Sequence, residues 1–125
     1  MKKQVLFGLV AGIALMAGVS AASAQDAGEG EKVFRQCKAC HSLDAGKKGV
    51  GPSLHGLIGR QSGTVEGFAY SPAMKAANIT WTPENLSKYL ADPKGFVAGN
   101  KMAFAGVKKE DDLKNLVAYL GEAAK

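Results

Sequence analysis

Apolar residues near the end of the chain recur with the spacing of an amphipathic helix. Leu113, Leu116, Val117 and Leu120 occupy positions i, i+3, i+4 and i+7, so they line one face of a helix over about 110–123. Three acidic residues stand at its beginning, where the helix dipole favours negative charge. The pattern predicts a helix that buries this face against the rest of the domain.

Two more helices are predicted by a hydroxyl residue directly followed by proline. Serine and threonine are good N-caps, and proline fits the first helical position. A short helix should begin after Ser71, and a longer one after Thr82. The longer helix has an apolar face formed by Leu86, Tyr89 and Leu90.

Glycine and proline dominate most of the remaining chain. Residues 30–40 are typical of another short helix, whereas 42–51, 54–68 and 93–106 are rich in loop-forming residues. Pro93 should also end the preceding helix. Because no segment shows convincing strand alternation, the sequence predicts an all-α domain of short helices and long loops. Loops of this length make sense if they wrap around a flat cofactor.

Residues 1–24 have the organisation of a secretory signal peptide. Two lysines precede an uncharged, mostly apolar run over 5–19, which is short for a membrane span. Residues 22–24 read Ala-Ser-Ala, a small-residue cleavage site. We therefore expect cleavage after residue 24, leaving a single domain over 25–125 that is exported to the periplasm.

The charge balance adds a hint about partners. The chain has a formal net charge of +5, and the signal contributes two lysines and no acid, which leaves +3 on the exported domain. A moderate positive charge favours an acidic protein partner reached by electrostatic steering. No dense cluster of lysine and arginine is present, so nucleic acid is not expected as a partner.

The sequence Cys37-Lys38-Ala39-Cys40-His41 carries the clearest chemistry. C-x-x-C-H is the signature of covalent c-type haem attachment, in which two thiols on one side of a turn bind the porphyrin and the histidine ligates the iron. A thioredoxin-like redox pair would need a βαβ context. A zinc site would need further cysteines or histidines than this chain offers. A structural disulfide is a third alternative in an exported protein.

A haem iron held by His41 has one more axial position. The candidates outside the signal are His55, Met74 and Met102. Met102 lies in a loop between two helices, far from His41 in sequence, where it could cross the other haem face. Met74 lies in a predicted short helix, where we expect it to pack against the haem edge or the core. His55 lies on a stretch that should be near the His41 side of the haem. We therefore favour Met102, although methionine is often only a core filler.

Taken in order, these motifs resemble those of class I c-type cytochromes, most closely bacterial cytochrome c2 and mitochondrial cytochrome c. The resemblance covers nearly all of 25–125. It implies a small all-α fold of short helices and loops around one covalently bound haem c. It also implies packing of the N-terminal helix on the C-terminal helix, through Gly30 and Phe34 against Leu116 and Tyr119.

The resemblance also implies roles for individual residues. Cys37 and Cys40 attach the haem, and His41 and Met102 are its axial ligands. The Pro52 carbonyl accepts a hydrogen bond from the proximal histidine, and Tyr89 lies beside the methionine ligand. Phe104 belongs to the ligand loop. Three residues contact the haem propionates: Arg60, Tyr70 and Trp81. The sequence departs from the mitochondrial pattern at four positions. Met74, Ala98 and Asn100 stand where asparagine, proline and threonine are usual, and Gln36 stands where a lysine is common.

The expected function is that of a soluble, monomeric, periplasmic one-electron carrier and not of an enzyme. By resemblance, its partners are membrane redox complexes with acidic docking surfaces, met transiently. The donor would be a quinol–cytochrome c oxidoreductase, and the acceptor a terminal cytochrome oxidase or a photosynthetic reaction centre. Six lysines are candidates for the docking face: Lys38, Lys48, Lys94, Lys101, Lys108 and Lys109. A haem enzyme or ligand-binding protein with an open iron site, and a haem-free thiol–disulfide oxidoreductase, remain alternatives.

Overall fold

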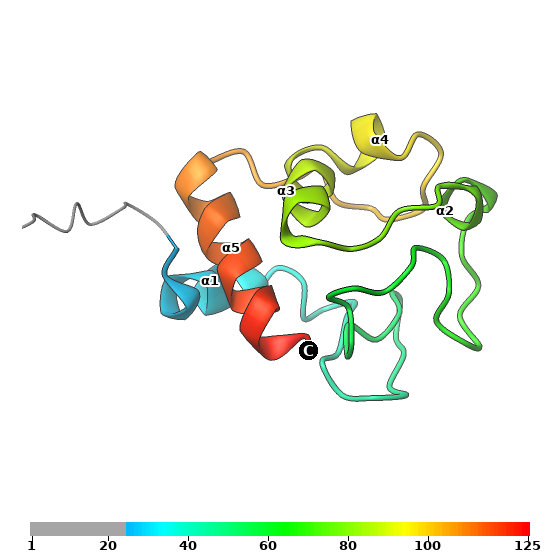
Figure 1. Cartoon of the computed structure of the whole chain (residues 1–125), viewed down its shortest axis with the longest axis horizontal. Helices are drawn as coiled ribbons and strands as arrows, with labels where there is room; N and C mark the ends of the chain where they lie inside the picture. Colours follow the sequence, from blue (N-terminus) through cyan, green and yellow to red (C-terminus); the bar gives the residue numbers. More distant parts are fainter. Residues whose placement is uncertain (1–24) are drawn as a thin grey trace, which may run out of the picture.

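The computed structural model describes residues 25–125. Five α-helices follow one another in this range, joined mostly by long irregular segments (Figure 1). They are α1 (Ala27–Phe34), α2 (Pro72–Ala76), α3 (Pro83–Ala91), α4 (Pro93–Phe96) and α5 (Glu110–Ala123). Extended pairing within the described range is confined to one antiparallel bridge between Gln61 and Thr80. The all-α prediction is therefore confirmed, whereas the predicted signal peptide and its cleavage site lie outside the described residues.

The two predicted serine and threonine caps are present. The Ser71 hydroxyl accepts a hydrogen bond from the Met74 backbone N–H at 3.1 Å, and Pro72 is the first residue of α2. The Thr82 hydroxyl accepts one from the Asn85 N–H at 3.1 Å. Each hydroxyl thus satisfies a backbone donor that has no partner within its own helix.

Two predicted boundaries were wrong. The helix expected over 30–40 starts earlier, because Asp26 caps it through the N–H groups of Gly28 and Glu29. It ends at Phe34, and the chain continues in tight turns up to residue 40. The expected loop over 93–106 begins with the short helix α4, because the Asp92 carboxylate accepts a hydrogen bond from the Gly95 N–H.

Helices α1 and α5 pack directly against each other, as predicted (Figure 1). A Cβ atom at Gly30 would overlap the backbone carbonyl of Asn115, so only glycine permits this approach. The Phe34 and Tyr119 rings lie 5.3 Å apart, and Leu116 is fully buried. This contact between the first and last helices brings the two ends of the described chain together.

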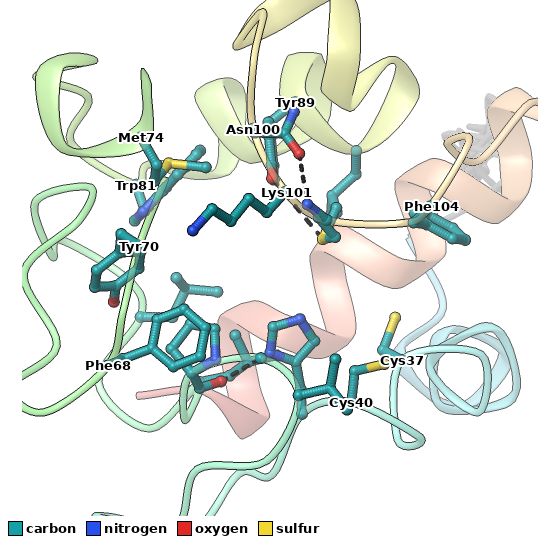
Figure 2. Close-up of a pocket in the computed structure, with 18 of the residues that line it drawn as sticks. Cys37, Cys40, Phe68, Tyr70, Met74, Trp81, Tyr89, Asn100, Lys101 and Phe104 are labelled. Carbon is teal, nitrogen blue, oxygen red and sulfur yellow. Dashed lines mark hydrogen bonds between the residues drawn. The ribbon is translucent and has the colours of Figure 1, made fainter. Parts of the chain in front are cut away.

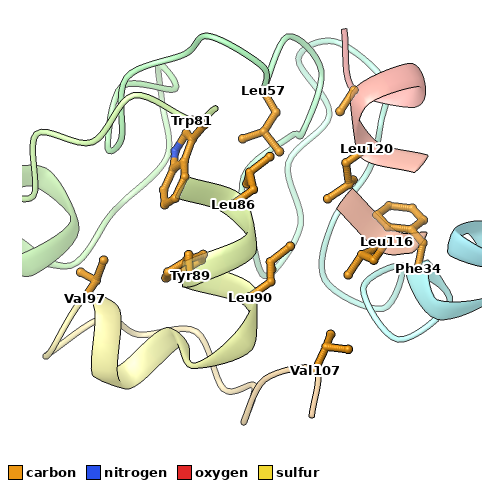
Figure 3. Packing of buried hydrophobic residues seen from close by; sticks show 11 residues of the cluster. Phe34, Leu57, Trp81, Leu86, Tyr89, Leu90, Val97, Val107, Leu116 and Leu120 are labelled. Atoms are coloured by element: carbon orange, nitrogen blue, oxygen red, sulfur yellow. The ribbon is translucent and has the colours of Figure 1, made fainter. Parts of the chain in front are cut away.

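The hydrophobic core has two parts that face each other (Figure 3). One comes from the chain ends, with Phe34, Leu116 and Leu120. The other comes from the middle of the chain, with Trp81 and α3. The helices of the described range include none that is both long and apolar enough to cross a membrane. The site described next lies between the two parts of the core.

Candidate functional site

A largely apolar cavity of about 320 Å³ lies within the domain. All ten residues that the sequence assigned to a haem site line it, namely Cys37, Cys40, His41, Pro52, Arg60, Tyr70, Trp81, Tyr89, Met102 and Phe104. Figure 2 shows the two cysteines on one side of the cavity, and Tyr89 and Lys101 across from them. The fold therefore brings together residues from the whole length of the domain.

The two cysteines lie on the turn that follows α1. The Cys37 carbonyl accepts hydrogen bonds from the N–H groups of Cys40 and His41, at 3.1 and 2.9 Å, so all three residues belong to one turn. Both thiols are free, and burial, followed by the nearby Cys40, raises the pKa of Cys37 to about 11. Thiol–disulfide exchange needs an accessible thiolate with a lowered pKa. The raised pKa therefore disfavours the Cys37 thiolate that such a reaction would use.

His41 is held in one orientation. Its Nδ1 lies 2.8 Å from the Pro52 carbonyl oxygen, and because a carbonyl can only accept, Nδ1 carries the proton in this bond. A side chain on Gly51 would overlap the imidazole ring, so glycine leaves the space that the ring occupies. Burial lowers the pKa of His41, which favours the neutral form. The Nε2 lone pair is then available to a metal ion.

A thioether and a phenol meet on another part of the cavity wall. The Tyr89 hydroxyl donates a hydrogen bond to the Met102 sulfur across 3.8 Å. Burial raises the pKa of Tyr89 to about 12, so the phenol stays protonated and remains a donor. Tyr89 comes from α3, and its ring also packs on Trp81 with ring centroids 5.0 Å apart.

Arg60 supplies a half-buried positive charge, and one of its donors, Nε, is buried and unused. Its Nη1 donates to the carbonyl oxygens of Ser53 and His55, at 3.0 and 3.1 Å. Its Nε is buried without a hydrogen-bond partner among the described residues. Buried polar groups nearly always have partners, so this nitrogen indicates an acceptor that the polypeptide does not supply. An anionic group bound in the cavity, such as a carboxylate, would satisfy it.

Of the three candidates for the second axial ligand, the structure distinguishes His55 from the two methionines by its position. Met102 and Met74 both line the cavity, whereas His55 is exposed and lies outside its lining. Figure 2 places Met74 next to Trp81, with Cys37 and Cys40 at a distance across the cavity. The position of His55 outside the cavity lining gives it no place beside a group bound there, and its backbone carbonyl accepts a hydrogen bond from Arg60.

Sequence reasoning missed several residues of the wall. Phe68 lines the cavity and packs edge-on against Tyr70, with ring centroids 4.8 Å apart. Val50 also lines the cavity yet is 78 % exposed. Phe68 could have been found from the sequence, because Phe68 and Tyr70 are aromatic residues in a glycine-rich segment that has few other side chains to bury. Nothing in the local sequence marks Val50.

The donor set fits a haem with two thioether attachments. Two thiols and an imidazole share one turn, a thioether sulfur lies in the same cavity, and the walls are mainly apolar. The orphaned Arg60 Nε fits a propionate. A closed zinc site does not fit, because the described residues contain no cluster of three or more His, Cys, Asp or Glu side chains placed to bind a metal.

Comparison with known proteins agrees with this geometry. The family model described as cytochrome c matches residues 27–124. The chain is 52 % identical over 119 residues to cytochrome c2 of Blastochloris viridis, covering 94 % of this chain and 91 % of that protein. It is 52 % identical over 98 residues to cytochrome c-550 of Nitrobacter winogradskyi, covering 78 % and 90 %. Cytochrome cH from Methylobacterium extorquens has a similar structure, with a TM-score of 0.72, 43 % identity, and coverage of 77 % and 97 %.

Proposed function

We propose that this chain, which belongs to the cytochrome c family, is a one-electron carrier whose haem iron is ligated by His41 and Met102. Family membership implies electron transport and one covalently bound haem c, and Cys37 and Cys40 are the two cysteines of the chain. The haem supplies one-electron redox chemistry, and the polypeptide decides which ligands and which surroundings the iron has.

The observation that supports the proposal is that two candidate ligands, each held by a hydrogen bond, line one cavity. The His41 ring is fixed by its 2.8 Å bond to the Pro52 carbonyl, and the Met102 sulfur is fixed by the Tyr89 hydroxyl. Ligation by both would leave no open position for a substrate, which favours a carrier over a haem enzyme. A thioether also raises the reduction potential relative to a second imidazole.

The cavity walls serve the same function by excluding water. Buried residues of both core parts, including Leu57, Leu86 and Leu116, line the cavity. Arg60 lies among the lining residues and is the group proposed to hold a propionate. In an apolar surrounding that excludes water, few solvent dipoles would have to reorient when the charge of the iron changes, which suits fast electron transfer.

Partner recognition is proposed to use the rim of the cavity. Val50 and Lys101 are exposed and line the cavity, so an edge of the bound group would approach the surface there. All six candidate lysines of the docking face are exposed. A positive rim would speed the encounter with acidic membrane redox complexes, whether quinol–cytochrome c oxidoreductase, cytochrome oxidase or photosynthetic reaction centre. The chain would act as a monomer in the periplasm, through transient contacts.

One set of spectra tests the ligation. Protein expressed with periplasmic haem attachment should stain for haem on a denaturing gel and show the weak near-infrared band of methionine bound to ferric haem. Met102→Ala should keep the haem, lose the band and lower the reduction potential by on the order of 100 mV. Met74→Ala is the matched control, because Met74 lines the same cavity and should leave the band in place.

Each failure points to a different alternative. A colourless, unstained product would support a haem-free thiol–disulfide oxidoreductase. A stained product without the band, able to bind external ligands readily, would support a haem enzyme or ligand-binding protein with an open iron site. For the partners, the rate of reduction by an acidic redox complex should fall as salt rises, and a rate independent of salt would contradict the docking proposal.

A further inference from the structure

One buried side chain links the Met102 segment to α4. Asn100 is 5 % exposed, and its Nδ2 donates to the carbonyl oxygens of Pro93 and Val97, both at 2.8 Å. Its Oδ1 accepts from the Met102 backbone N–H at 2.9 Å. Both donor hydrogens of the amide and its oxygen are therefore used. Figure 2 shows Asn100 beside Tyr89, at the same part of the cavity as Lys101.

The partners of Asn100 belong to a part of the fold that is itself well anchored. Pro93 begins α4 and is fully buried, and Asp92 caps this helix. Helix α4 packs on α3, the helix that also carries Tyr89. Asn100 therefore connects the backbone of Met102 to the same structural unit that holds the Met102 sulfur.

Apart from the Tyr89 bond to the Met102 sulfur and the 3.2 Å backbone bond from the Asn100 N–H to the Val97 carbonyl, the other attachments of the segment are exposed or distant. Lys94 donates from its Nζ to the carbonyl oxygens of Asn100 and Met102, at 2.8 and 3.2 Å, but its side chain is exposed. The far end is held at α3, where the Val107 N–H donates to the Leu90 carbonyl at 2.8 Å. Between these points, Asn100 is the buried hydrogen-bonding side chain next to Met102, and breaking its bonds would leave polar groups unpaired inside the protein.

We propose that Asn100 is a positioning residue that keeps Met102 at the cavity and sets how readily this segment opens. The inference rests on the proposed ligation by Met102. An external ligand such as imidazole can reach the iron only after the methionine leaves. The apparent affinity for imidazole is therefore the intrinsic affinity multiplied by the fraction of molecules in which Met102 has left. A larger fraction raises the apparent affinity in proportion.

The test measures imidazole binding to the ferric, haem-loaded protein. Asn100→Ala removes all three hydrogen bonds and should tighten imidazole binding by about tenfold to about a hundredfold. Asn100→Ser keeps a hydroxyl that can accept from the Met102 N–H but cannot reach both the Pro93 and the Val97 carbonyl. If the link to α4 is what matters, Asn100→Ser should tighten binding nearly as much as Asn100→Ala.

A second buried asparagine provides the matched control. Asn115 is 9 % exposed, and its Oδ1 accepts from the Asp26 N–H at 2.9 Å, which joins α1 to α5 away from the cavity lining. Asn115→Ala should lower the midpoint of urea unfolding but leave the imidazole affinity unchanged. If the role of Asn100 were merely structural, Asn100→Ala would behave like Asn115→Ala: the midpoint of urea unfolding would fall and the imidazole affinity would not change.

The outcomes separate this inference from the proposed function. Wild-type imidazole affinity in Asn100→Ala would overturn it, and wild-type affinity in Asn100→Ser would overturn the link to α4. Should Asn100→Ala fail to fold, Asn100→Ser decides the question. If Met102→Ala binds imidazole no more tightly than wild type, ligation by Met102 itself is wrong. If Met102→Ala binds more tightly and the Asn100 variants do not, only the role of Asn100 fails.

Discussion

The Tyr89 hydroxyl donates a hydrogen bond to the Met102 sulfur across 3.8 Å, and both residues line the same cavity. This bond draws electron density from the sulfur. A sulfur that donates less density stabilises ferric iron less, so the bond should raise the reduction potential if Met102 is a ligand. The relationship leads to a direct prediction.

Tyr89→Phe should lower the reduction potential by up to about 60 mV, the equivalent of one modest hydrogen bond for a one-electron couple. The near-infrared band should persist, because the sulfur itself is unchanged. A redox titration measures the effect. Tyr119→Phe serves as the control, since Tyr119 packs on Phe34 outside the cavity lining and its loss should not move the potential.

Arg60→Gln should also lower the reduction potential, because removing a half-buried cation makes the ferric state less unfavourable. The variant also loses a guanidinium that donates to Ser53 and His55, so the free energy of unfolding should fall by about 1–3 kcal/mol. Arg35→Gln, at an exposed position, should change neither quantity appreciably. Equal potentials for the two variants would contradict a propionate contact at Arg60.

Gly30→Ala should destabilise the domain by at least about 3 kcal/mol, because the new methyl group would overlap the Asn115 carbonyl and force α1 and α5 apart. Urea unfolding measures the loss. Gly121→Ala makes the same change on α5 where the space around the glycine is open, and it should stabilise by up to about 1 kcal/mol. Similar effects at both positions would mean that the helix contact is looser than the structure shows.

The chain made without haem attachment should contain much less helix. Residues of both parts of the core line the cavity of about 320 Å³, and without a bound group these apolar walls would lose their packing partner. Far-ultraviolet circular dichroism of the Cys37→Ala, Cys40→Ala double variant, produced without haem, measures this. A spectrum equal to that of the haem-loaded protein would show that the polypeptide core suffices alone.

Part of this molecule was predictable because it depends on interactions between near neighbours in sequence. The helix over 110–123 follows from apolar spacing, and the starts of α2 and α3 follow from a hydroxyl cap before proline. The spacing of Cys37, Cys40 and His41 places all three on one turn, which determines the kind of cofactor. The all-α class, the cofactor and the contact of the terminal helices were predicted correctly, the last by resemblance.

Other features depend on contacts between distant segments. The sequence alone offered His55, Met74 and Met102 as ligands, and the tertiary structure left His55 at the surface. Asn100 seemed only a departure from a family pattern until the fold placed its amide on three backbone groups. Local patterns determine which segments become helical and which residues can bind a haem. Which of these segments and residues come into contact is decided by close packing of the whole chain. Two residues far apart in sequence can then be neighbours in space, which local patterns do not reveal.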